Sequence, residues 1–214
     1  MTAVQEVNDQ TLELLHEFFA AATHDASAAM CRWTDGLVNV TLDEVREVAL
    51  EEVSAAMNIG DELLTMVVLT IHGEVGGNLL LVFDELNGRQ LAASLLGREV
   101  GTEPEWSELE KSALTETGNI LGCAYVNALT RLIGVDLMPS PPYFIQDYGA
   151  SVLEQALMAQ ALTSDQLLLC EIGFRRRDQQ LDWRVVFVPT PGMREAMQRS
   201  LHTAQCGARG RGNP

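Results

Sequence analysis

The sequence predicts an α+β fold in which two pseudo-symmetric halves, each helix–strand–hairpin–helix, form one continuous sheet with long helices packed on it. Long stretches with apolar residues at helical spacing alternate with short apolar runs that turn residues separate. The same order of elements occurs twice, and the glycines Gly36 and Gly134 close the long helix in each copy. Internal repetition of this kind favours halves that pair through their strands and share a core.

The first half contains the clearer strand signals. In chain order, we expect a helix over residues 11–33, a strand over 37–40, a hairpin of strands over 62–71 and 78–83, and a helix over 86–96. Asp35 and Gly36 would end the first helix. Glycines between the two hairpin strands supply the backbone angles that a tight turn needs. Gly97 would close the last helix of this half.

The second half begins with a well-marked helix. In chain order, we expect a helix over residues 107–133, a strand over 135–138, a hairpin of strands over 166–174 and 183–188, and a helix over 192–205. Ser107 and Glu110 form a capping-box pattern, and Pro104 lies just before it. The basic run Arg175–Arg177 is interpreted as a solvated hairpin tip, longer than its counterpart in the first half.

The repeat sets the expected domain boundaries. Residues 1–206 are expected to form a single domain of two pseudo-repeats, over about 11–97 and 107–205. Residues 207–214 are rich in Gly and Arg, and we expect them to be a disordered tail.

Composition disfavours several classes of partner. The formal net charge is −16 at pH 7, whereas binding to nucleic acid or to an anionic membrane depends on clustered Lys and Arg. The longest apolar runs are too short to span a bilayer. Residues 1–10 lack the basic start and apolar stretch of a signal peptide. We therefore expect a cytoplasmic protein with neither a nucleic-acid nor a membrane partner.

Cysteine and histidine follow no pattern that predicts a disulfide or a metal site. The cysteines lie far apart without a CxxC pair, at Cys31, Cys123, Cys170 and Cys206. His16 and His24 could share a helix face, but no cluster of carboxylates or thiols completes a metal site there. We expect free thiols, and no metal or cofactor of the protein's own.

The residues that suggest chemistry lie in the middle of the second long helix. Ser112, Glu116 and Asn119 are spaced four and three apart, which places them one above another on a single helix face. Gly118 and Gly122 are poor helix formers, each costing about 1 kcal/mol relative to Ala. They suggest that something approaches this backbone closely. Taken alone, Glu116 and Asn119 are also compatible with an ordinary solvated face.

The wider spacing resembles that of a known family. Ser112, Glu116, Asn119 and Pro142 match the signature of the CheC/CheX/FliY chemotaxis phosphatases, in which Ser or Asp precedes Glu, Asn and Pro at these separations. The resemblance is greatest to CheC and extends over about residues 11–201. It implies a CheC-like fold and hydrolysis of the aspartyl phosphate on a CheY-like response regulator, in chemotaxis or another two-component pathway.

The resemblance also implies a role for each residue. Asn119 would orient the attacking water, and Glu116 would dock to the regulator's active-site lysine. The Mg²⁺ of such a reaction belongs to the regulator, which agrees with the expected lack of a metal site here. Ser112 and Pro142 would support the motif without a chemical step. An aspartyl phosphate is already activated, so positioning can supply much of the barrier reduction.

The first long helix carries an incomplete copy of the pattern. Glu17 falls on the family's glutamate, but Ala20 occupies the asparagine position, and a methyl group cannot hold a water. Phe18 and Phe19 are expected to make this face bulkier. We therefore predict one functional site, in the second half.

Two other functions remain open. A degenerate CheC-like or FliM-like binding module would dock a regulator, or a CheD-like deamidase, without hydrolysing anything. An unrelated enzyme is the third reading, but the sequence contains no Walker loop and no G-x-S-x-G. The glycines of residues 73–77 lack the strand–turn–helix context of a dinucleotide fingerprint and are better read as a hairpin turn.

Overall fold

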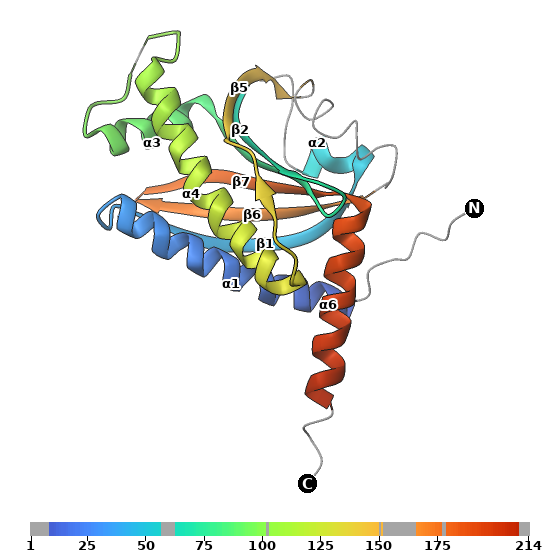
Figure 1. Ribbon diagram of the computed structural model, residues 1–214. Helices are drawn as coiled ribbons and strands as arrows, with labels where there is room; N and C mark the ends of the chain where they lie inside the picture. Colours follow the sequence, from blue (N-terminus) through green and yellow to red (C-terminus); the bar gives the residue numbers. More distant parts are fainter. Residues whose placement is uncertain are drawn as a thin grey trace.

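One antiparallel sheet organises the protein, whose computed structural model describes residues 9–56, 63–101, 103–149, 151, 166–176 and 179–209. Its strands are β1 (Val38–Ala49), β2 (Leu63–His72), β3 (Gly77–Asp84), β4 (Met138–Pro139), β5 (Tyr143–Tyr148), β6 (Gln166–Arg176) and β7 (Gln179–Pro189). Their spatial order is β1–β6–β7–β3–β2–β4, and β5 also pairs with β2. Figure 1 shows β1, β6 and β7 side by side, with β2 and β5 rising beyond them.

The two halves exchange strands. β1 of the first half pairs with β6 of the second, from Val38 opposite Arg176 to Ala49 opposite Gln166. In the same way, β5 of the second half pairs with β2 of the first. β3 and β7 pair between the two hairpins. This arrangement confirms the predicted α+β fold with two pseudo-symmetric halves in one continuous sheet.

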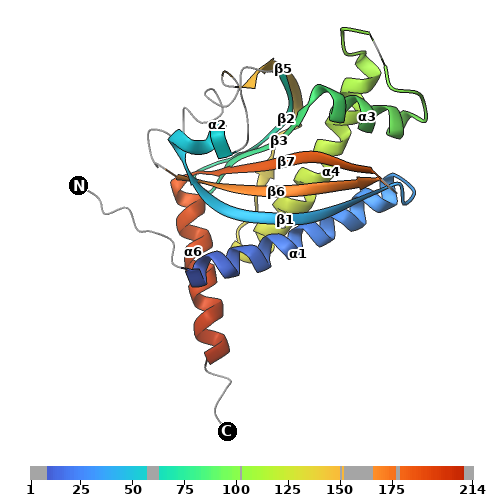
Figure 2. The same ribbon diagram turned by 180° about the vertical axis from the view of Figure 1, so that it is seen from behind.

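Buried side chains lie on both faces of the sheet. The larger core joins one face to four helices, α1 (Asp9–Trp33), α3 (Glu85–Leu96), α4 (Glu108–Ile133) and α6 (Pro191–Arg209). The smaller core covers the other face and includes Met66, Leu80 and Val186, with Val53 from α2 (Val53–Ala56), which follows the short η1 (Leu50–Glu52). Successive strand residues point to opposite faces, so a strand buried on both reads as a continuous apolar run. Figure 2 shows α4 behind the strands when the molecule is seen from the other side.

The boundaries of α4 agree with the sequence prediction. Ser107 is the N-cap: its hydroxyl accepts from the Glu110 backbone N–H, and the Glu110 carboxylate accepts from the Ser107 backbone N–H. Gly134 ends the helix with φ +68°, and its N–H donates to the Thr130 carbonyl. Local side-chain chemistry therefore fixes both ends of the helix that carries the candidate residues.

Strand β1 is much longer than predicted. The expectation was a strand over residues 37–40, whereas β1 continues to Ala49. The pairing with β6 shifts register between Leu42 and Glu44, which is a β-bulge. A bulge breaks the alternation of apolar and polar residues. Val45 is therefore buried in the larger core with Val38 and Val40, although it lies an odd number of residues from them, and Val48 is buried in the smaller core. The alternation that predicts a strand is therefore interrupted at the bulge, although the strand itself continues to Ala49.

The segments after α4 also differ from expectation. The strand predicted over residues 135–138 is wrong for residues 135–137, because β4 begins only at Met138, and β5 was not predicted at all. β5 is a half-exposed edge strand that follows a proline-rich run, so its sequence lacks a clear apolar pattern. α6 extends to Arg209, three residues into the stretch expected to be a disordered tail; residues 210–214 lie outside the described part. The interpretation of Arg175–Arg177 as a long hairpin tip is wrong: Arg175 and Arg176 belong to β6 and pair with Gln180 and Gln179 of β7. Arg177 lies outside the described part.

The glycines of α4 are explained by the chain's own sheet. A Cβ at Gly118 would lie 2.4 Å from Val67 Cγ1, and a Cβ at Gly122 would lie 2.6 Å from Leu69 Cδ1. Both partners are on β2. The close approach suggested by these glycines is therefore real, but it is made by an internal strand and not on the exposed face.

Gly118→Ala is expected to lower the free energy of unfolding by about 1–2 kcal/mol, because overpacking this contact costs more than the helix propensity that Ala gains. Gly122→Ala is the matched control. A Cβ at Gly122 would contact the end of the flexible Leu69 side chain, so Gly122→Ala should lower the free energy of unfolding less. Urea denaturation measures both, and a Gly118→Ala variant more stable than wild type would contradict the packing argument.

Candidate functional site

A row of polar side chains runs along the outer face of α4; we call Ser112, Glu116, Asn119 and Cys123 the α4 polar stripe. Ser112 and Glu116 are exposed, and Asn119 and Cys123 are half-buried. The spacing of four, three and four residues keeps them on one face. The opposite face is formed by Leu114, Leu121 and Leu129, all buried in the larger core. The stripe is therefore a ridge on the molecular surface.

Asn119 and Cys123 contact each other within the stripe. The Cys123 thiol donates to Asn119 Oδ1 over 3.6 Å. Burial raises the pKa of Cys123 above its ordinary value of 9.0, and the nearby Glu116 carboxylate raises it further. The thiol is therefore protonated at neutral pH and acts as a hydrogen-bond donor.

Pro142 lies on the segment that joins β4 to β5, beside β2. Ser140 and Thr70 fix this segment: the Ser140 N–H donates to the Thr70 carbonyl over 2.7 Å, and Ser140 Oγ accepts from the Thr70 N–H over 3.0 Å. Pro142 is half-buried and immediately precedes Tyr143, which pairs with Val68. Pro142 thus belongs to the segment that borders β2, the strand on which α4 packs, and it is not part of the α4 polar stripe.

The α1 counterpart of the stripe lacks a carboxamide and has a different setting. Glu17 is exposed, and Ala20 is half-buried. A shallow groove of about 480 Å³ lies here, lined by Leu12, Glu13, His16, Glu17 and Val45. The expectation that Phe18 and Phe19 make this face bulkier is wrong for Phe19, which is 1% exposed and lies in the larger core. Phe18 is half-buried and packs partly against the same core.

The two long helices are joined by polar contacts between them. Thr23 Oγ1 on α1 lies 2.7 Å from the Tyr125 hydroxyl on α4, and both groups are buried. At the surface, Arg131 of α4 forms an ion pair with Asp25 of α1, with 2.5 Å between Nη2 and Oδ2. Burial raises the pKa of Tyr125 far above its ordinary value, so its hydroxyl remains neutral and able to bond with Thr23.

A charged cluster fixes the first turn of α4 against α3. Arg98 Nη2 lies 3.1 Å from Glu110 Oε1, and Arg89 Nη1 lies 3.7 Å from the same oxygen. The Arg89 guanidinium lies over the Trp106 ring at 4.5 Å and also pairs with Glu85. The adjoining hollow of about 340 Å³ has further glutamates at its rim, so these arginines are neutralised within the protein and do not form an anion site.

Glu110 titrates abnormally in this cluster. Burial alone would raise its pKa, but hydrogen bonds from the Ser107 side chain and backbone, together with Arg98 and Arg89, lower the pKa below 4.5. A carboxylate whose pKa is lowered on folding stabilises the folded state above its unfolded pKa, and this contribution is lost as pH falls through the folded pKa.

Glu110→Gln is expected to lower the free energy of unfolding by about 2 kcal/mol at pH 7, since the ionised acceptor of several hydrogen bonds is lost. The difference from wild type should narrow as the pH falls below about 4.5. Urea denaturation at a series of pH values measures it. Glu108→Gln, on the same turn but exposed, is the control. If the difference in free energy of unfolding between wild type and Glu110→Gln stayed constant below about pH 4.5, the role given to the Glu110 charge would be disproved.

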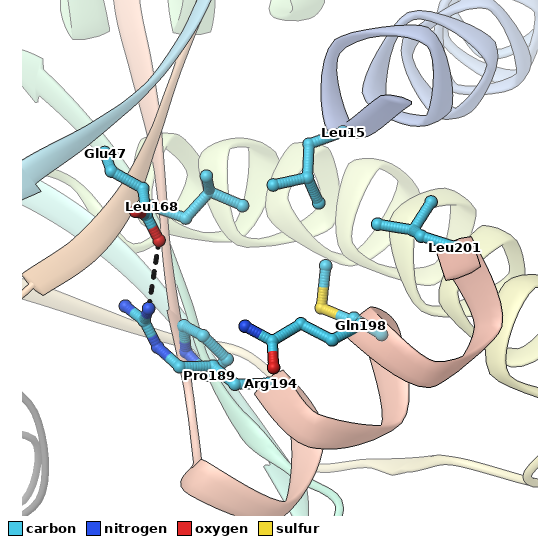
Figure 3. A pocket seen from close by; sticks show the side chains of 8 residues that line it. Leu15, Glu47, Leu168, Pro189, Arg194, Gln198 and Leu201 are labelled. Carbon is cyan, nitrogen blue, oxygen red and sulfur yellow. Dashed lines mark hydrogen bonds and ion pairs between the residues drawn. The ribbon is translucent and has the colours of Figure 1, made fainter. Parts of the chain in front are cut away.

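A small cavity lies where α1 and α6 meet the sheet (Figure 3). It measures about 30 Å³ and is lined mainly by apolar side chains, among them Leu15, Leu168 and Leu201. At its wall, Arg194 Nη1 donates to Glu47 Oε1 over 3.0 Å. The cavity holds at most one or two waters. No residue of the α4 polar stripe lines it.

Among the described residues, His, Cys, Asp and Glu form no group of three or more that could hold a metal ion. No helix in the described part of the chain is long and apolar enough to span a membrane. Cys31, Cys123 and Cys170 are free thiols, as expected, whereas the Cys206 side chain lies outside the described part.

Sequence reasoning overlooked Cys123 and the Arg89–Glu110 cluster. Cys123 lies four residues after Asn119, so the spacing that grouped Ser112 with Glu116 would have placed it on the same face. Arg89 lies four residues after Glu85 on α3, a spacing that favours an ion pair on one helix face. The structure places Ser112, Glu116 and Asn119 together and leaves Pro142 on a neighbouring element.

Comparison with known proteins gives related sequences but no matching family model. CheY-P phosphatase CheC of Bacillus subtilis (strain 168) is 19% identical over 193 residues, covering 88% of this chain and 92% of that protein. Putative CheY-P phosphatase CheC1 of Halobacterium salinarum (strain ATCC 29341 / DSM 671 / R1) is 21% identical over 149 residues, covering 68% and 74%.

Solved structures share the fold. FliY of Thermotoga maritima superposes with a TM-score of 0.72 at 15% identity, covering 92% of this chain and 100% of that one. The FliM middle domain of H. pylori gives 0.67 at 12% identity, covering 90% and 99%. A chain of the CheX–CheY–BeF3–Mg²⁺ complex of Borrelia burgdorferi gives 0.50 at 20% identity, covering 79% and 96%. Together with the CheC sequences, these likenesses confirm the predicted resemblance to the CheC/CheX/FliY family.

Proposed function

We propose that this protein hydrolyses the aspartyl phosphate of a CheY-like response regulator, with Asn119 orienting the attacking water and Glu116 docking to the regulator's active-site lysine. The observation that carries the proposal is the ridge itself: Glu116 is exposed and Asn119 half-exposed, less than one turn apart on a helix that is fixed from behind. Likeness to CheY-P phosphatase CheC, and to a chain of a CheX–CheY complex, supports the choice of partner. Ser112 and Pro142 have no chemical step in this proposal.

The chemistry requires little beyond orientation. The water oxygen attacks phosphorus, the bond from phosphorus to the aspartyl oxygen breaks, and the aspartate leaves as a stable carboxylate. The proton lost by water passes to the released phosphate or to solvent. A well-placed water can gain most of the needed acceleration from alignment alone. Asn119 suits this task because a carboxamide both donates and accepts hydrogen bonds without titrating.

Docking depends on a few specific contacts. A net charge of −16 gives no long-range attraction toward the anionic surface around a phosphorylated aspartate. The exposed Glu116 carboxylate would pair with the regulator's lysine, and a surface ion pair of this kind mainly sets register. Mg²⁺ would be supplied by the regulator, and the reaction would take place in the cytoplasm.

Asn119→Ala is expected to lower kcat for dephosphorylation by about 10²-fold with little change in KM, because water is no longer held in line. Glu116→Ala should act mainly on KM, because it removes a docking contact that is present before and during the reaction. The measurement is phosphate release from a phosphorylated receiver domain, with and without each variant.

Matched controls are available on the same two helices. Asn127→Ala removes an exposed carboxamide further along α4, and Glu17→Ala removes the exposed glutamate at the equivalent place on α1. Both should retain wild-type rates. If Asn119→Ala or Glu116→Ala also turned over at the wild-type rate, the assignment of the site would be wrong.

A non-catalytic binding module is the second candidate. The likeness to the FliM middle domain and the loss of the carboxamide at Ala20 favour it. Such a CheC-like or FliM-like module would bind a regulator, or a CheD-like deamidase, through the same ridge. Saturable binding to a phosphorylated regulator whose dephosphorylation rate does not change would establish this function in place of the first.

A further inference from the structure

We infer that Cys123 is a positioning residue that holds the Asn119 carboxamide in its working orientation. The inference rests on the proposed phosphatase function. Cys123 lies one helical turn after Asn119, on the same face, and its Sγ lies 3.6 Å from Asn119 Oδ1. Asn119 and Cys123 are both half-buried, so this contact is partly shielded from water.

The direction of this hydrogen bond is fixed by the chemistry of both groups. A thiol is a weak donor, and Oδ1 is an acceptor with two lone pairs. Burial and the Glu116 carboxylate raise the pKa of Cys123, which keeps the proton on sulfur. The oxygen side of the carboxamide is therefore directed toward the C-terminal end of α4, where Cys123 lies.

This orientation determines what Asn119 offers to a bound phosphoryl group. The thiol uses one lone pair of Oδ1, and the other remains free to accept a proton from the attacking water. Because the amide is planar, its NH₂ group lies on the side away from Cys123, with two donors available for phosphoryl oxygens. Without the thiol, rotation of the side chain's terminal torsion would exchange these two arms, since that torsion is broad and roughly two-fold.

Two other roles for Cys123 fit the structure less well. A redox or nucleophilic cysteine needs a lowered pKa, because the thiolate is the reactive form, and here the shift is in the opposite direction. A purely structural cysteine resembles Cys170, which is fully buried in the larger core. Cys123 instead lies at the edge of the stripe and contacts the residue to which the water is assigned.

The test compares three variants in the phosphate-release assay with the full chain and a phosphorylated receiver domain. Cys123→Ala removes the donor and is expected to lower kcat about fivefold with KM unchanged, the size expected for one weak hydrogen bond. Cys123→Ser restores a donor and should recover the wild-type rate. Cys31→Ala, which alters another half-buried cysteine on a long helix, is the control and should have no effect.

A second readout does not depend on turnover. In ¹⁵N-labelled protein, the side-chain amide signal of Asn119, identified by its loss in Asn119→Ala, should shift in Cys123→Ala and return in Cys123→Ser. An unchanged signal and rate in Cys123→Ala, or equal loss of rate in the Ala and Ser variants, would overturn the inference. If Asn119→Ala loses activity while Cys123→Ala keeps the wild-type rate, the inference fails and the proposed function stands; a wild-type protein without phosphatase activity refutes both.

Discussion

The contact between α4 and β2 is the constraint on which the candidate site depends. Gly118 and Gly122 allow the helix backbone to lie directly on Val67 and Leu69, and a side chain at either glycine would push the helix outward. Because this side of α4 is pressed on the strand, the side with Glu116 and Asn119 must project into solvent. The caps at Ser107 and Gly134 then set where along the sheet the projecting residues lie. The packing of α4 on β2 thus determines the position of the α4 polar stripe on the surface.

The two long helices use a symmetric frame in different ways. α1 contributes a core aromatic at Phe19, which packs against Tyr125 and Phe187, and a buried hydroxyl at Thr23, which bonds to Tyr125. Its exposed face has a carboxylate at Glu17, and Ala20 stands at the position that Asn119 occupies on α4. α1 therefore supports α4 from the side, while α4 carries the polar residues in contact with solvent. The two halves of a pseudo-symmetric fold can therefore have different roles.

Much of this architecture could be predicted because its signals are local. The capping box at Ser107, the glycine at residue 134 and the period of the helical apolar residues depend only on near neighbours in sequence, and they gave the bounds of α4 closely. The grouping of Ser112, Glu116 and Asn119 required only helical geometry.

What could not be predicted depends on contacts between distant segments. The bulge near Leu42 hides the continuation of β1, and β5 is recognisable only from its pairing with β2. Phe19 points inward because α1 packs against α4, and this packing cannot be deduced from the sequence of α1 alone. The partner of Gly118 is likewise set by the tertiary fold, so the sequence indicated a close approach without indicating what makes it.

The exchange of strands between the halves has a consequence for how the chain reaches its native state. β1 finds its partner in β6 and β5 finds its partner in β2, so most of the sheet joins residues far apart in sequence. Closing such large loops costs conformational entropy before the stabilising contacts form. Folding is therefore expected to be slower than that of a helical bundle of equal length. The pairings β1–β6, β2–β5 and β3–β7 all join one half to the other, so we expect the two halves to fold as one cooperative unit.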